Sequence, residues 1–150
     1  MKNGLLRGSR PVDHTADLAL RVWAPNLPGL FEEAALGLSG LITDPARVAS
    51  IEKHQFELTA LDLEELLVTW LGEILYLDET SGLLFSAFDN LQIRFQSDRG
   101  LFRLSATGLG EKRDSGRHRR RSAIKAPTYH GLVISPDSEI GYDLTIVFDT

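Results

Sequence analysis

The sequence lacks cysteine altogether, which excludes disulfide bonds and thiolate metal ligands from its 150 residues. It also lacks an apolar run of about 18 residues, the length that a membrane-spanning helix needs. Residues 1–10 are basic and interrupted by glycine, unlike the start of a secretory signal peptide. We therefore expect a soluble, cytoplasmic protein that makes no contact with a membrane.

Several common functional motifs are absent as well. We find no glycine-rich phosphate-binding loop, no His-Glu-x-x-His zinc motif and no nucleophile elbow. No internal repeat, low-complexity tract or linker divides the chain. With 43% hydrophobic and 25% charged residues, we expect one domain over residues 1–150, in which residues 1–12 form an N-terminal extension.

Positive charge is concentrated in one segment, although the net charge of the chain is −5. Residues 112–121 contain a single acidic residue, Asp114, and six basic residues. Such a segment can contact RNA phosphates or an acidic partner, or it can be a mobile, solvated connection. The second interpretation is favoured, because the segment has no aromatic residue to stack on a base. The six basic residues are Lys112, Arg113, Arg117, Arg119, Arg120 and Arg121.

Two segments have the periodicity of amphipathic helices. Asn26 is placed to cap a helix over residues 27–41, with Pro28 tolerated in its first turn. Asp62 and Glu65 form an acidic capping box for a second helix over residues 61–77. The apolar face of that second helix predicts a buried stripe of Leu66, Leu67, Trp70, Leu71 and Ile74.

The remaining segments are typical of strands, expected over residues 18–22, 47–58, 91–95, 101–104, 124–134 and 142–148. Strand and helix alternate early in the chain, and the second half is mainly strand. The pattern predicts an α+β fold: a single domain with two main amphipathic helices packed on a mixed, largely antiparallel β-sheet.

Two carboxylates stand at the ends of expected strands. Asp149 ends the strand over residues 142–148, and Asp17 opens the strand over residues 18–22. If these strands are neighbours, the two carboxylates and the oxygens of Thr150 can share a divalent ion. Oxygen ligands alone suit calcium, magnesium or manganese. The alternative is that these acidic residues are only solvated or capping groups.

A set of short motifs resembles those of the archease family, in the same order and with similar separations from residue 13 to residue 150. They are His-Thr-Ala-Asp at 14–17, Phe-Glu-Glu-Ala-Ala at 31–35, Asp-Leu-Glu-Glu-Leu-Leu at 62–67, Gly-Glu at 110–111, Lys-Ala-Pro-Thr-Tyr-His-Gly-Leu at 125–132 and Phe-Asp at 148–149.

The resemblance implies a non-enzymatic accessory protein of the GTP-dependent tRNA-splicing RNA ligase. Archeases help this ligase to become guanylylated and to turn over repeatedly in tRNA splicing and RNA repair. The resemblance also implies a bound divalent metal, calcium or a similar ion such as magnesium or manganese, held by Asp17, Asp149 and Thr150. Contact with RNA would then be indirect, through the ligase.

The resemblance also gives further site candidates. Lys125, Tyr129 and His130 are expected to face the partner, and His14 is expected to orient Asp17 from behind. For all four, the alternative is an ordinary structural role at a strand end. Pro127 stands where archeases usually have valine, which predicts a strand edge or a bulge. A second departure is that Arg119 to Arg121 make the basic segment more basic than is usual in the family. His118 keeps the family's spacing from Gly110, and no catalytic task is assigned to it.

Two other functions stay open from the sequence. One is a chaperone-like modulator of an RNA-modifying enzyme such as a tRNA methyltransferase, a role also associated with archeases. The other is a metal-dependent phosphohydrolase that uses Asp17 and Asp149, for which no nucleophile is evident.

Overall fold

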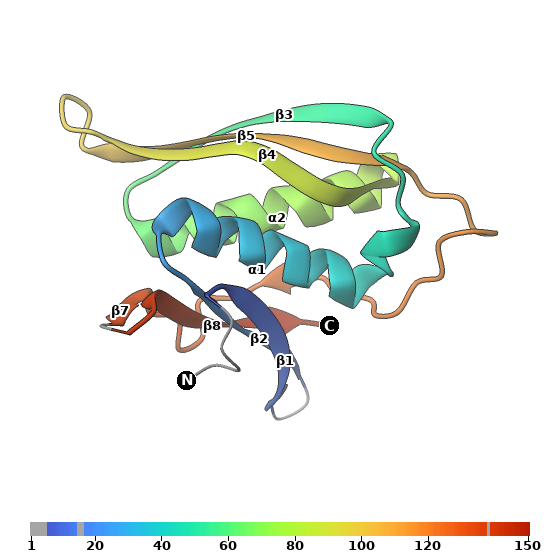
Figure 1. Ribbon diagram of the computed structural model, residues 1–150, viewed down its shortest axis with the longest axis horizontal. Coiled ribbons are helices and arrows are strands. Elements are labelled where there is room, and N and C mark those ends of the chain that lie inside the picture. Colours follow the sequence, from blue (N-terminus) through green and yellow to red (C-terminus); the bar gives the residue numbers. More distant parts are fainter. Residues whose placement is uncertain (1–5, 15–16, 138) are drawn as a thin grey trace.

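The computed structural model describes residues 6–14, 17–137 and 139–150, and it places two helices between two β-sheets (Figure 1). Among these residues, no helix is long and apolar enough to cross a membrane. The predicted α+β class and single domain with two main helices are confirmed, and the strands divide between two sheets.

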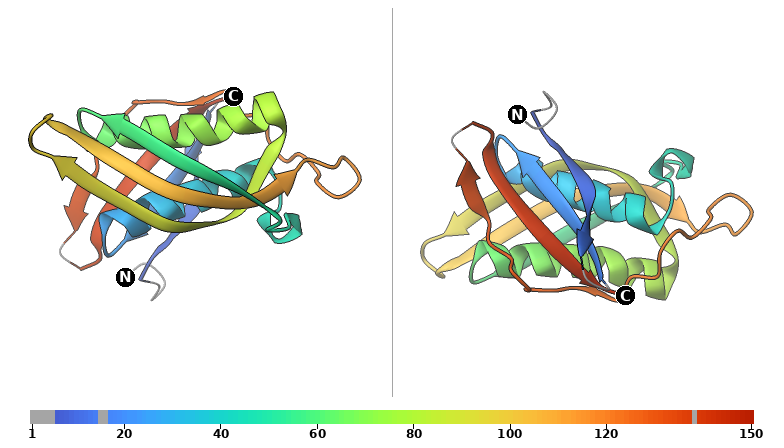
Figure 2. Two further views of the ribbon diagram at one scale, coloured as in Figure 1. Left: turned by 90° about the horizontal axis from the view of Figure 1, so that it is seen from above. Right: turned by 90° about the horizontal axis from the view of Figure 1, so that it is seen from below.

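All strand pairs among the described residues are antiparallel. One sheet has three strands in the order β3 (Glu52–Ala60), β5 (Leu101–Lys112) and β4 (Leu83–Gln96). The other has five strands and covers the opposite side of the helices (Figures 1 and 2). Its order is β1 (Gly8–His14), β2 (Asp17–Ala24), β8 (Gly141–Asp149) and β6 (Ala126–Pro127), with β7 (Ser135–Asp137) also pairing with β8.

The helices begin where the capping residues predict. In α1 (Leu27–Ile42), the side chain of Asn26 accepts a hydrogen bond from the main-chain N–H of Gly29 at 2.8 Å. In α2 (Leu63–Ser81), Asp62 accepts from the N–H of Glu65, whose side chain in turn accepts from the N–H of Leu61. A short 3₁₀ helix, η1 (Pro45–Arg47), follows α1.

The core lies between the two sheets, around α2. All five residues of its predicted buried stripe are at most 2% exposed, as are Ile146 and Phe148 on the inner face of β8. The indole N–H of Trp70 donates to the main-chain oxygen of Phe31 at 2.9 Å, and its ring meets the edges of Phe56 and Phe88. The buried indole therefore keeps its polar atom satisfied.

Three strand predictions need correction. The strand predicted over residues 47–58 begins only at Glu52, because Pro45–Arg47 form η1. The β4–β5 hairpin is much longer than predicted. The prediction is too short because register irregularities near Ser86 and Asn90 interrupt the side-chain alternation that marks a strand in the sequence. The strand predicted over residues 124–134 is wrong apart from Ala126–Pro127. Pro127 lacks an N–H, and Gly131 turns the chain with a φ of 63°.

The edge strands of the five-stranded sheet can also be compared with the sequence predictions. Of the range expected to be an N-terminal extension, residues 8–12 lie in β1 and pair with β2. The edge position predicted from Pro127 is confirmed, because β6 forms one margin of the five-stranded sheet.

Candidate metal and partner-binding site

The structure brings Asp17 and Asp149 together at one end of neighbouring strands. The antiparallel register of β2 and β8 pairs Leu18 with Phe148, so its continuation by one position sets Asp17 opposite Asp149. Directly opposed residues in such a ladder have Cβ atoms about 4.5–5.5 Å apart. The two aspartates are therefore cross-strand neighbours, an arrangement in which two carboxylates can approach one ion.

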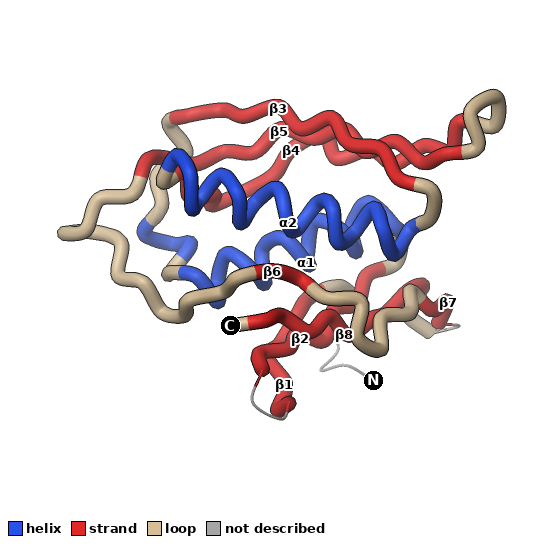
Figure 3. Tube along the Cα trace, turned by 180° about the vertical axis from the view of Figure 1, so that it is seen from behind, coloured by secondary structure: helices blue, strands red, loops and turns tan. Residues whose placement is uncertain are grey.

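The two carboxylates point away from the helices. Phe148 packs into the core, and side chains alternate along a strand, so Asp149 lies on the outer face of the sheet with its opposed neighbour Asp17. Ala126 lies opposite Asp149 on the other side. Figure 3 shows the end of β8 beside β6, so three segments meet at this end of the sheet.

The donor chemistry of this end fits a hard cation. Two carboxylates and the main-chain oxygens of Thr150 are oxygen ligands, and calcium takes about six to eight of them, so water would have to complete the shell. Two like charges opposite each other also repel, and a cation relieves that repulsion. In the part of the chain that the structure describes, no three His, Asp or Glu side chains form a metal cluster.

The other predicted site residues are spread along the neighbouring strands. The main-chain N–H of Lys125 donates to the main-chain oxygen of Asp149 at 2.9 Å, which puts the backbone of Lys125 beside the end of β8. His14 ends β1 in register with Asp17, but its side chain lies outside the described residues. The prediction that His14 orients Asp17 stays a prediction.

Tyr129 and His130 lie further from that end. The N–H of Thr128 donates to the oxygen of Val147, so the chain has already moved back along β8 when it reaches Tyr129. Partial desolvation raises the pKa of the Tyr129 hydroxyl above its usual range, and the charges of Glu65 and Asp62 raise it further. The same stretch of chain meets the acidic start of α2, because the N–H of Ile134 donates to Glu64 at 3.0 Å, and Leu61 is exposed there.

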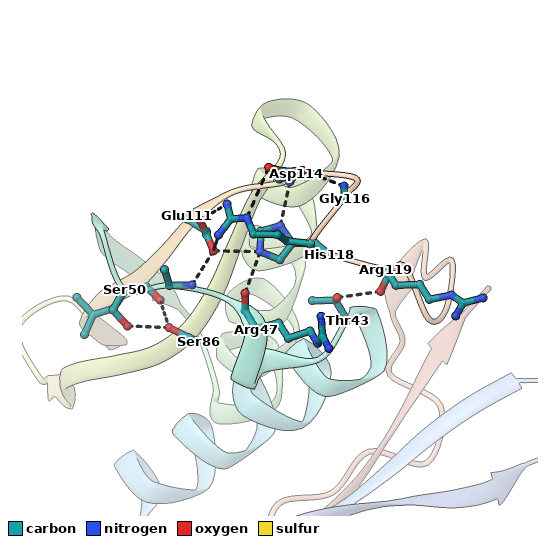
Figure 4. A network of polar contacts seen from close by, with 12 residues as sticks. Thr43, Arg47, Ser50, Ser86, Glu111, Asp114, Gly116, His118 and Arg119 are labelled. Carbon is teal, nitrogen blue, oxygen red and sulfur yellow. Dashed lines mark hydrogen bonds and ion pairs between the residues drawn. The ribbon is translucent and has the colours of Figure 1, made fainter.

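A buried polar network holds the basic segment on the molecule, close to α1 and η1 (Figure 4). Glu111 and His118 are only 2% and 4% exposed. Glu111 accepts hydrogen bonds from the N–H of Ala49, from Arg117 and from His118, at 2.7, 2.7 and 3.0 Å. These donors hold the pKa of Glu111 at about 2, well below 4.5.

The hydrogen bonds of His118 fix its neutral tautomer. Its Nδ1 accepts from the N–H of Asp114 at 2.9 Å, so the ring proton lies on Nε2. Nε2 then donates between Glu111 Oε2 and the main-chain oxygen of Arg47, at 3.0 and 3.1 Å. His118 ties three segments together, and this is a structural task rather than a catalytic one.

A second buried carboxylate fixes the same segment from the other side. Asp78 of α2 is 5% exposed and pairs with Arg113 and Arg120. The prediction that residues 112–121 form only a solvated connection is therefore wrong. Arg113, Arg117 and Arg120 compensate buried carboxylates, which cost stability when left unpaired.

The sequence reasoning missed Glu111 and Asp78 as anchors of this segment. One signal was available: an acidic residue on the apolar face of α2, four positions after Ile74, needs a cationic partner, and the nearby excess of arginine supplies it.

The chain matches the archease protein family (MTH1598/TM1083) over residues 10–150. The protein archease of Saccharolobus islandicus is 38% identical over 137 residues, which cover 91% of this chain and 94% of that relative. The protein archease of Methanopyrus kandleri is 37% identical over 123 residues, 82% of this chain and 86% of its own.

Two solved structures have the same fold. The solution structure of Methanobacterium thermoautotrophicum protein 1598 is 32% identical, covers 95% of this chain and 99% of its own, and superposes with a TM-score of 0.81. The crystal structure of an archease from Thermotoga maritima, described as a possible chaperone, is 20% identical, covers 94% and 96%, and has a TM-score of 0.57. At that identity it supports the fold alone.

These observations define a class of protein: an α+β domain that has two helices between antiparallel sheets and two opposed aspartates at one end of a sheet. The chain belongs to the archease family. The predicted resemblance is thus confirmed.

Proposed function

We propose that this archease is a non-enzymatic accessory protein of a GTP-dependent tRNA-splicing RNA ligase and that it promotes guanylylation and repeated turnover of the ligase. Its family membership supports this proposal, together with the motifs at residues 14–17, 125–132 and 148–149. The single observation that carries the site is the register of β2 and β8, which opposes Asp17 to Asp149.

In this proposal a divalent ion, calcium or else magnesium or manganese, binds Asp17, Asp149 and Thr150. The ion would supply a fixed positive charge on the outer face of the sheet, to which an acidic or phosphorylated group of the ligase can be drawn. The main chain of Lys125 lies next to that of Asp149, so its ammonium group would add a second positive charge to this end of the sheet. Tyr129 and His130 would extend the docking surface toward the start of α2.

The test is ligase turnover with limiting ligase, measured with and without this protein. Asp17→Asn and Asp149→Asn should abolish the stimulation and also remove the heat of calcium binding in calorimetry. Asp98→Asn, at the exposed turn after β4, removes the same charge elsewhere and should change neither reading.

The outcomes separate the candidate functions. Wild-type protein that leaves ligase turnover unchanged would contradict the proposal. If the protein instead shifts the product pattern of a tRNA methyltransferase, the chaperone-like modulator replaces it. Phosphate release by the isolated protein, lost in Asp17→Asn, would make it a phosphohydrolase.

A further inference from the structure

A cleft of about 530 Å³ lies between the end of α1, η1 and the basic segment after β5. This volume is within the range of small-molecule sites in proteins. The cleft is lined by Thr43, Asp44, Ser115 and Gly116 together with four arginines, Arg47, Arg117, Arg119 and Arg121. We call it the arginine cleft.

Two of the four guanidinium groups are already engaged. Arg117 pairs with Glu111 at 2.7 Å, and Arg121 donates to the oxygen of Gly40 and lies 3.9 Å from Asp44. Arg47 and Arg119 are exposed, and neither has an ion-pair partner among the residues described. These two arginines can therefore bind an anion without breaking an existing ion pair.

The backbone that carries these two arginines is held in place by buried groups (Figure 4). The buried hydroxyl of Thr43 donates to the oxygen of Arg119 at 2.8 Å, and buried His118 contacts the oxygen of Arg47 at 3.1 Å. A ligand therefore has to order side chains but not the loop, which lowers the entropic cost of binding.

We propose that the arginine cleft binds closely spaced phosphate groups, supplied by an RNA backbone or by a free nucleoside triphosphate. Guanidinium groups present paired N–H donors that match phosphate oxygens, and the cleft has no lysine in its lining. It also has no aromatic side chain on which a base could stack. Recognition is therefore of phosphate and not of base sequence. Neither Asp17 nor Asp149 lines the cleft, so this inference does not depend on the proposed function.

The experiment is fluorescence anisotropy of a labelled single-stranded oligoribonucleotide over a salt series. Arg47→Gln combined with Arg119→Gln should weaken binding at least about tenfold, since hydrogen bonds to charged groups are the stronger ones. The slope of log K against log salt should fall by roughly 1.4, about 0.7 for each lost phosphate contact.

The matched control combines Arg94→Gln with Arg99→Gln, which removes two exposed arginines at the β4–β5 hairpin. This hairpin and the basic segment lie at opposite ends of the three-stranded sheet (Figure 1). An equal loss in the control, or no loss in the cleft variant, would overturn the proposal.

Two competitors identify the phosphate source and test the chemistry. If guanosine triphosphate displaces the RNA from the wild-type protein but not from the cleft variant, the cleft is assigned to a free nucleotide. RNA binding that resists this competitor assigns it to the RNA backbone, and both results support a phosphate site. If polyglutamate binds as tightly as RNA and the cleft variant loses affinity for both, the cleft is a surface for acidic polymers in general. That result would contradict the proposal.

Discussion

Trp70 is the largest side chain among the described residues that has no exposed surface. Its replacement by alanine removes three aromatic or main-chain contacts and leaves a cavity, so Trp70→Ala should lower the free energy of unfolding by about 3–5 kcal/mol. Urea denaturation measures this change. Tyr76→Ala, at a 58% exposed position of the same helix, is the control and should cost much less.

Glu111 should make the stability of the protein depend on acid pH. Its folded-state pKa is lowered from 4.5 to about 2, so its contribution is fully present above pH 4.5 and is lost as the pH falls toward 2. Glu111→Gln should remove that part of the pH dependence and lower the stability at neutral pH. Thermal unfolding between pH 2 and pH 6 measures both effects.

The control for this prediction is Glu57→Gln, which removes a carboxylate from a surface ion pair with Arg103. Both partners are exposed, and such pairs contribute little to stability. Glu57→Gln should therefore keep the wild-type dependence on pH. Parallel pH profiles for wild type and Glu111→Gln would show that Glu111 is not the group that titrates.

At the scale of single elements, α1 carries two glycines that should respond to alanine with opposite signs. A Cβ at Gly40 meets no atom within 4 Å, so Gly40→Ala should stabilise the helix by about 0.5–1 kcal/mol. A Cβ at Gly37 would lie 2.6 Å from Ser9 Oγ and 2.9 Å from Leu20 Cδ1. Gly37→Ala should therefore destabilise the protein by pushing α1 away from β1 and β2.

The two variants are compared by their denaturant midpoints. The two substitutions lie three positions apart in one helix and change the helix propensity equally. Any difference between their effects on stability therefore comes from packing. Stabilisation by both substitutions would mean that α1 does not contact β1 as closely as described.

The elements that the sequence predicted best are those with local signals. Asn26 and Asp62 cap their helices through contacts three residues away, and the apolar stripe of α2 repeats every three or four positions. The first half of β4 escaped prediction because bulges at Ser86 and Asn90 shift the side-chain alternation. No local pattern reports such a shift.

The candidate site residues also fall into a group that the sequence could predict and a group that it could not. Asp17 and Asp149 could be paired from the sequence because each stands at the end of a strand-like run, and antiparallel neighbours bring such ends together. Glu111 and His118 could not, because the intervening residues have no periodicity and the chain folds back only through buried hydrogen bonds. Long-range contacts of this kind leave no trace in residue spacing.

At the scale of the whole molecule, a bound ion should stabilise the folded chain. If calcium binds only the folded state through Asp17 and Asp149, a concentration of 100 times the dissociation constant should add about 2.7 kcal/mol to the free energy of unfolding. Removal of the ion by a chelator should reverse the rise in melting temperature. Asp149→Asn should melt at the same temperature with and without calcium, and an equal rise in this variant would place the ion elsewhere.

The segment that joins the basic loop to β6 fixes how far apart the two candidate sites can be. The N–H of Arg121 is bonded to the oxygen of Ile42, and the N–H of Lys125 is bonded to the oxygen of Asp149. Four residues span at most about 14 Å, even when fully extended. A protein partner of ordinary size covers about 800 Å² of surface, a patch roughly 30 Å across. A protein centred on Asp149 therefore reaches the margin of the arginine cleft, and a phosphate ligand in that cleft would share its footprint.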